Sequence, residues 1–226
     1  MTGYEDYGVR LRSYIESVNQ CTIPFEIIVV EDINEKNSVL LETLFTEDYF
    51  KEKHVRHIQY QAKYPNPHNY NMIEAFTKNV GIQAAHYDFI CVTNCDITFN
   101  YAFFPFLKTI QPNVFYRFLQ YEKDEVNETC INPDLKDKTK WTLNAIARKS
   151  GDIMLMDKVS WNKIKGYPEN TVWVHSDLIV CKVVNNNKIP VVVPPKVKIY
   201  TLPQVRSIVE QPYEIEKTME YFNVCN

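Results

Sequence analysis

The stretch Asp88-Phe89-Ile90-Cys91-Val92-Thr93-Asn94-Cys95-Asp96-Ile97 decides how this sequence is interpreted. Its apolar run, residues 88–92, predicts a buried strand, and polar residues follow at once. Asn94 and Asp96 are spaced i, i+2, so their oxygen atoms lie on the same side of an extended chain. Such a pair suits a hard divalent cation, which prefers oxygen ligands and often bridges to substrate phosphates. The alternative is that the two residues simply begin a turn, as Asn and Asp often do.

The composition of the chain limits the classes of function. With 226 residues, the chain suits one large domain. The net charge of −3 and the lack of a long basic block argue against a nucleic-acid partner. The longest apolar runs, such as 27–30 and 191–193, are too short to cross a bilayer. The first six residues contain no apolar signal core. We therefore expect no intrinsic membrane span, while peripheral attachment to a membrane through a partner stays open.

The six cysteines form no C-x-x-C pair, which argues against a structural zinc site. Their spacing also shows no disulfide framework, so we expect a reducing, cytoplasmic compartment.

Strand-like and helix-like segments alternate through the first half of the chain. The pattern predicts helices over 10–19, 38–45 and 71–85, and strands over 25–30, 55–60 and 88–92. This order predicts an α/β fold with a mostly parallel central sheet flanked by helices, similar to a Rossmann fold. Because ligands in such sheets bind beyond the carboxyl ends of the strands, Glu31-Asp32 and Asn94–Asp96 should face one site.

The second half of the chain, residues 101–226, has a different character within the same single domain. We expect short helices at 103–107 and 158–163, and a helix over 176–184. Strands are predicted at 114–120, 153–156 and 188–193, and a terminal helix at 211–222. Residues 122–140 carry ten charged side chains, which predicts a long surface loop or a lid.

Four short segments occur in a fixed order along the chain: 25–32, 78–85, 93–96, and the block formed by 151–156, Trp161 and 166–169. Together they resemble the GT-A-fold glycosyltransferases, which use nucleotide sugars. The last block is similar to the acceptor block of galactosyltransferase-like members. His175-Ser176-Asp177 stands where that family has its acidic catalytic motif. The resemblance divides the chain into a nucleotide-binding half, residues 1–100, and an acceptor-binding half, residues 101–226.

The chain departs from the family pattern at four places. Asn94 replaces the first acid of the DXD motif, and Lys78 replaces an arginine. Residues 1–4 resemble only the tail of the family's opening strand. Tyr200-Thr201-Leu202 stands where a late metal-binding histidine is expected.

The resemblance implies an enzyme that moves a sugar from a nucleotide-diphosphate sugar, most often a UDP-sugar, to a hydroxyl of a glycan, protein or lipid. It implies Mn²⁺ or Mg²⁺ as cofactor, with Asp96 as a direct ligand and His175 as a stand-in for the missing histidine. Asn94 would contact the ribose or a metal-bound water. Glu31 or Asp32 would contact the base or ribose, and Lys78 a phosphate oxygen. Each of these residues also has an ordinary structural role open to it: a turn, a solvated helix position or a core histidine.

The acceptor hydroxyl must lose a proton to a general base, and the resemblance places Asp177 in that role. A position near a helix N-terminus favours its ionised form, although a helix-capping role is equally open. One base without an opposing nucleophile predicts an inverting transfer. The acceptor-binding candidates are Asp152, Trp161, Tyr167 and Glu169. The aromatic pair could equally pack in the core, and Asp152 could equally belong to a turn.

Two other functions stay open from the sequence. A nucleotidyltransferase would share the α/β sheet and the metal, but it should carry a glycine-rich phosphate loop near the first strand. The chain has only five glycines and no such loop. A non-catalytic module that binds a nucleotide or a sugar is compatible with Asn94 and with the missing histidine.

Overall fold

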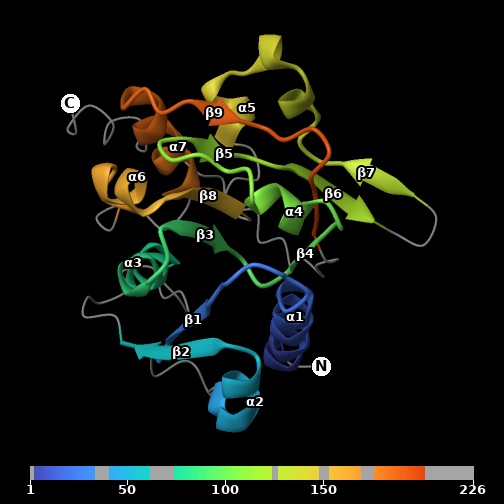
Figure 1. Ribbon diagram of the computed structural model, residues 1–226, viewed down its shortest axis with the longest axis vertical. Helices are drawn as coiled ribbons and strands as arrows, with labels where there is room; N and C mark the ends of the chain where they lie inside the picture. The colour runs from blue at the N-terminus through green and yellow to red at the C-terminus, as the bar shows by residue number, and fades with distance from the viewer. Residues whose placement is uncertain are drawn as a thin grey trace.

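The computed structural model describes residues 3–33, 41–61, 74–123, 127–147, 153–168 and 176–201 (Figure 1). The helices are α1 (Gly3–Val18), α2 (Glu47–Glu52), α3 (Glu74–Ala84), α4 (Phe103–Leu107), α5 (Leu143–Ala147), α6 (Lys158–Lys163) and α7 (Ser176–Asn186). The strands are β1 (Ile27–Asp32), β2 (Val55–Tyr60), β3 (Phe89–Thr93), β4 (Ile97–Phe99), β5 (Phe115–Tyr116), β6 (Leu119–Lys123), β7 (Glu128–Cys130), β8 (Ile153–Asp157), β9 (Val191–Val192) and β10 (Lys198–Thr201). The predicted terminal helix at 211–222 lies outside the described residues.

The first unit of the fold is a parallel pair of strands covered by α1 and α2. β1 pairs with β2 in the register Ile27 to Val55. Leu11 and Ile15, one turn apart on α1, are buried against Ile27 and the ring of Phe50. Gly3 and Tyr4 already belong to α1, so the expected tail of an opening strand is wrong for these residues: the chain is helical there.

The other described strands form two four-stranded sheets, in the orders β3-β8-β5-β9 and β4-β10-β6-β7. β10 pairs in parallel with β6, and β5 with β9, whereas β3–β8, β5–β8, β4–β10 and β6–β7 are antiparallel. The predicted α/β architecture is confirmed. The pairing is more mixed than expected for two reasons: the predicted strand β8 pairs antiparallel with β3 and β5, and β4, β7 and β10, which the sequence pattern did not predict, add further antiparallel ladders.

β8 is the centre of the core, because all five of its residues are buried. Met154 and Met156 pack on one face against residues from α3, α6 and α7. Ile153 and Leu155 pack on the other face against α4 and the β4–β10 ladder. The β3–β8 sheet is therefore the middle layer of the larger part of the molecule, with helices on one side and the second sheet on the other (Figure 1).

The charged segment 122–140 is ordered structure where it is described. It contains the end of β6, then β7 and two short 3-10 helices, Pro133–Lys136 and Lys138–Lys140. Asn132 is buried, with its side chain accepting from Gln120 N at 2.8 Å and donating to Phe118 O at 2.9 Å. Leu135 is also buried against the sheet. Over 127–140 the expected irregular loop is instead β7 and two 3-10 helices, which these two residues anchor, while most side chains of the segment are exposed. A lid role stays a prediction.

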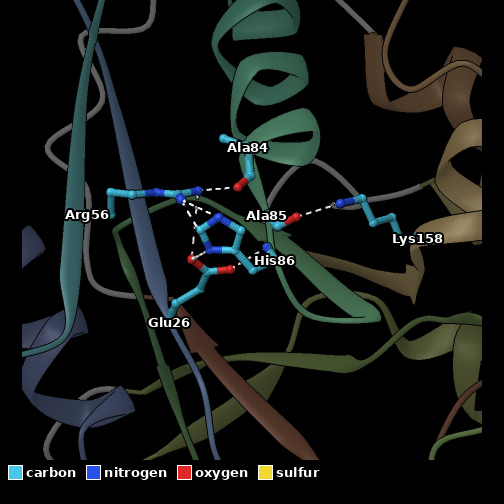
Figure 2. Close-up of polar contacts among 6 residues, drawn as sticks. All are labelled: Glu26, Arg56, Ala84, Ala85, His86 and Lys158. Atoms are coloured by element: carbon cyan, nitrogen blue, oxygen red, sulfur yellow. Dashed lines mark hydrogen bonds and ion pairs between the residues drawn. The ribbon is translucent and has the colours of Figure 1, made fainter.

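A polar cluster at the start of the strands connects the β1–β2 pair to α3 and β3. Glu26, just before β1, accepts from the backbone N–H of His86 at 2.6 Å and forms an ion pair with Arg56 of β2 at 3.7 Å. The guanidinium of Arg56 also contacts the His86 ring and donates to Ala84 O (Figure 2). Lys158 donates to Ala85 O at 2.6 Å. The cluster lies at the amino ends of β1 and β3, opposite the ends where an α/β sheet binds ligands.

Candidate functional site

The two acids at the end of β1 point to opposite faces of the strand, as adjacent strand residues do. Glu31 is held within the β1–β2 unit. Its carboxylate accepts from Leu41 N at 2.7 Å and lies 2.9 Å from Nε2 of His57 on β2. These contacts give Glu31 a structural role in fixing the chain after β1.

Asp32 lies on the other face, which it shares with Val30. The side chain of Val30 lies against Gly81 of α3, so this face is the one that α3 covers. Asp32 is only 5% exposed although it carries a carboxylate. Of the two acids, Asp32 is therefore the better candidate for contact with a ligand.

Asp96 occupies the bend between β3, which ends at Thr93, and β4, which begins at Ile97. It is 5% exposed, and the neighbouring Cys95 packs against the apolar cluster of α1 and β1. Asn94 is half-buried in the same bend. The structure thus places Asn94 and Asp96 directly after a buried strand, where the sequence predicts them.

The last strand, β10, closes this corner. It pairs with β4 in the antiparallel register Thr201 to Ile97, so Thr201 lies beside the residue that follows Asp96. In Figure 1 the last described residues, coloured orange to red, run to β4. Local sequence pattern does not predict this strand, and its only signal in the sequence is the position of Tyr200–Leu202 in the family resemblance.

Lys78 is used in packing. It forms an ion pair with Glu74, one turn earlier on α3, and its Nζ lies 5.1 Å from the centre of the Tyr167 ring. Its side chain is 9% exposed. These contacts support a packing role for Lys78 rather than a contact with a phosphate oxygen.

Trp161 and Tyr167 are core residues, at 0% and 1% exposed. Their rings stack with centroids 5.7 Å apart and planes 19° apart. Trp161 Nε1 donates to Ile90 O at 3.2 Å, and the Tyr167 hydroxyl donates to Met154 Sδ at 3.4 Å. Because no face of either ring is open to a sugar in this arrangement, the burial supports the packing alternative for both residues.

Asp177 lies in the first turn of α7 and is half-buried. Burial raises the pKa of Tyr167 well above its usual value, and the charges of Glu74 and Asp177 raise it further. Asp177 is therefore within electrostatic reach of the Tyr167 hydroxyl, in the same region as Lys78. Asp152, Glu169 and His175 lie outside the described residues, so their assignments stay predictions.

Asn79, next to Lys78 on α3, connects the two halves of the chain. Its side chain accepts from Tyr167 N at 2.7 Å and donates to Tyr167 O at 2.8 Å. Gly166 has a φ of +68°, and a Cβ there would lie 2.3 Å from Oδ1 of Asn79. The turn after α6 is therefore built around Asn79 and accepts only glycine at position 166 without rearrangement.

The donor set at the Asp96 corner consists of oxygen atoms, which suits a hard cation. The residues that the structure describes contain no group of three or more His, Cys, Asp or Glu side chains arranged to hold a metal. Mg²⁺ is often held by one or two carboxylates together with substrate phosphates, and a single aspartate beside an asparagine fits that kind of site.

Comparison with known proteins shows a shared fold. The sequence matches no protein-family model and no curated protein. The structure is similar to a Pyrobaculum calidifontis mannosyltransferase in complex with GDP-Man and Mn²⁺, with a TM-score of 0.60 and 10% identity over 88% of this chain. It is also similar to GalNAc-T7 with UDP, GalNAc and Mn²⁺ (TM-score 0.59, 13% identity, 91% of this chain) and to Staphylococcus aureus TarS (0.56, 14%, 85%).

These three proteins are GT-A-type glycosyltransferases, and the chain has the GT-A fold. The chain spans about half the length of these neighbours, matching 55%, 43% and 58% of their respective chains. Among the described helices, none is long and apolar enough to cross a membrane.

Proposed function

We propose that this chain is a glycosyltransferase that moves a sugar from a nucleotide-diphosphate sugar to an acceptor hydroxyl, with a divalent cation bound at Asp96. The observation that carries the proposal is the buried position of Asp96, in the bend after the strand that leads into it. Ligands in α/β sheets bind beyond the carboxyl ends of the strands, and carboxylate oxygens are ligands that hard divalent cations prefer. A cation held there would also bind the diphosphate of a donor.

Mn²⁺ or Mg²⁺, when bound, would supply Lewis-acid neutralisation of the charge that develops on the departing diphosphate. Asp96 and the neighbouring Asn94 would hold the cation or its water. Asp32, on the α3-facing side of β1, would accept a hydrogen bond from the ribose or the base. The neighbours' structures with UDP or GDP-Man support a UDP- or GDP-sugar as donor, without distinguishing the two.

Asp177 is the proposed general base, which takes the proton from the acceptor hydroxyl. It lies in the first turn of α7 and is half-buried. A single base acting by direct displacement predicts inversion at the anomeric carbon. The acceptor would be a glycan, protein or lipid hydroxyl.

The first experiment measures thermal unfolding with UDP, GDP and their sugars, each with and without Mn²⁺. A ligand at 100 times its Kd stabilises the folded state by about 2.7 kcal/mol, which raises the Tm of a chain of this size by about 5–10 °C. Asp96→Asn should abolish the shift. The matched control is Asp88→Asn, because Asp88 is exposed before the start of the same strand, and this variant should shift as the native chain does.

Transfer is then measured as release of UDP or GDP from the stabilising nucleotide sugar in the presence of candidate acceptors. Asp177→Asn should bind nucleotide and Mn²⁺ as the native chain does, yet transfer no sugar. NMR of the product's anomeric proton tests inversion. A metal-dependent Tm shift without transfer would favour the non-catalytic binding module, and no shift with any nucleotide would contradict the donor site.

A further inference from the structure

Tyr60 is an aromatic residue at the carboxyl end of the β1–β2 pair. It is the last residue of β2, and its register partner across the parallel ladder is Asp32, the last residue of β1. Register partners in a sheet have side chains on the same face. Because ligands bind beyond the carboxyl ends of parallel strands, Tyr60 and Asp32 are neighbours at the edge where a ligand is expected.

The face that carries these two side chains is the one covered by α3. Near the end of β1, the side chain of Val30 lies against Gly81 of α3. At the start of β2, the guanidinium of Arg56 donates to Ala84 O, at the end of α3. Alternation along each strand puts the last residues of β1 and β2 on that same face. The two contacts also show that α3 runs antiparallel to both strands, so its first turn lies at the ligand-binding end.

The ring of Tyr60 is not used in packing by the part of the chain that the structure describes. Tyr60 is half-buried, belongs to none of the hydrophobic clusters there, and contacts no other aromatic ring. Trp161 and Tyr167, in contrast, are enclosed in the core. Tyr60 therefore differs from these two aromatic candidates, because it is partly exposed and lies beside a buried carboxylate.

An accessible aromatic side chain next to a carboxylate suits a flat ligand that also carries N–H or O–H donors. A nucleobase with its ribose has both properties. We propose that Tyr60 binds the nucleobase of the sugar donor by stacking on one face of the base, while Asp32 accepts a hydrogen bond from the base or the ribose. This inference rests on the function proposed above and adds a residue of β2 to the donor site. Stacking of this kind accepts any base, because every base has a π-face.

The structural alternative is that tyrosine is present only because aromatic residues favour strands. Tyr60→Phe keeps the ring and removes the hydroxyl, whereas Tyr60→Leu and Tyr60→Thr both remove the ring. The matched control is Tyr87→Leu, because Tyr87 is an exposed tyrosine just before the amino end of β3, at the opposite edge from the expected ligand. Since Tyr60 lies outside the core clusters, its variants should keep the Tm of the native chain without ligand.

The test measures the Kd for UDP, GDP and ribose 5-diphosphate with Mn²⁺, by isothermal titration calorimetry. Ribose 5-diphosphate keeps the sugar and the diphosphate but lacks the base. Loss of a stacking aromatic weakens binding by about 5- to 150-fold per base. Tyr60→Leu and Tyr60→Thr should therefore bind the nucleotide about fivefold or more weakly, yet bind ribose 5-diphosphate as the native chain does. Tyr60→Phe and Tyr87→Leu should bind all three compounds as the native chain does.

Native nucleotide affinity in Tyr60→Leu and Tyr60→Thr would overturn the stacking role and leave the proposed function standing. An equal loss for the nucleotide and for ribose 5-diphosphate would also overturn it, because the effect would then belong to the strand or to the ribose rather than to the base. If the native chain binds neither UDP nor GDP with Mn²⁺, the proposed function fails and this inference fails with it.

Discussion

The contact of Asn79 with the turn after α6 makes a quantitative prediction about stability. Asn79→Ala removes two buried hydrogen bonds, at 2.7 and 2.8 Å, and leaves the N–H and C=O of Tyr167 without their side-chain partner. Each buried group left unsatisfied costs about 1–3 kcal/mol, so we expect a loss of about 2–6 kcal/mol in the free energy of unfolding. Urea denaturation followed by far-UV circular dichroism, at constant m-value, measures it.

Gly166 provides the second arm of a double-mutant cycle. Gly166→Ala alone places a Cβ at 2.3 Å from Asn79 Oδ1 and puts alanine at a φ of +68°. The backbone conformation costs about 1–2 kcal/mol, and the clash adds to it. In the Asn79→Ala background the clash is gone, so only the backbone cost should remain. We therefore expect the two changes to be non-additive by about 1 kcal/mol or more.

The control for this cycle is Asn100→Ala, which removes one exposed hydrogen bond, from Nδ2 to Lys196 O at 3.0 Å. Its cost should stay below about 1 kcal/mol. If Asn79→Ala costs no more than Asn100→Ala, or if the two arms of the cycle are strictly additive, then Asn79 does not hold the turn as we describe.

Two further predictions concern buried charged groups. Burial raises the pKa of Asp157, but hydrogen bonds from Ser160 and from Asn113 N outweigh it and hold the pKa below its usual range. This contribution to stability is present above the unfolded-state pKa and is lost as the pH falls through the folded-state pKa. The Tm should therefore fall less steeply between pH 7 and pH 3 for Asp157→Asn than for the native chain. An equally steep fall in Tm would contradict the lowered pKa of Asp157. Arg117 is fully buried, with Nε donating to Ile146 O at 3.0 Å and Nη1 to Ile153 O at 2.5 Å. Arg117→Lys keeps the charge but loses this pair of hydrogen bonds, so urea unfolding should show a loss of about 2 kcal/mol or more in the free energy of unfolding. Native stability of the variant would show that these two hydrogen bonds do not stabilise the fold.

The strands and helices with a strong local pattern were predictable from the sequence. The run 88–92 became β3, and residues 55–60 and 103–107 became β2 and α4. β4 and β10 were missed because they are three and four residues long and are defined by pairing with each other across about 100 residues. A sequence window does not contain that partner.

The candidate site shows the same division between local and long-range information. The placement of Asp96 after a buried strand follows from local pattern, but the choice between Glu31 and Asp32 depends on His57, which approaches from another strand. Trp161 and Tyr167 show the limit most clearly. An aromatic side chain in the core and one that stacks on a sugar look alike in sequence, and only the packing around β8 distinguishes them.

The separation of the sheets has a consequence for how this molecule responds to a ligand. Within the described residues, no backbone ladder joins the β1–β2 pair to the sheet that contains β3. Side-chain contacts make the connection: α3, the Glu26–Arg56–His86 contacts, and the packing of Ile28 and Cys95 across the two cores. Asp32 belongs to one of these bodies and Asp96 follows a strand of the other. A molecule that contacts both carboxyl groups, directly or through a cation, would act as a crosslink between them. Its affinity would then depend on the side-chain packing that sets the spacing of the two carboxyl groups, so a change in that packing would alter binding without removing a contact to the ligand.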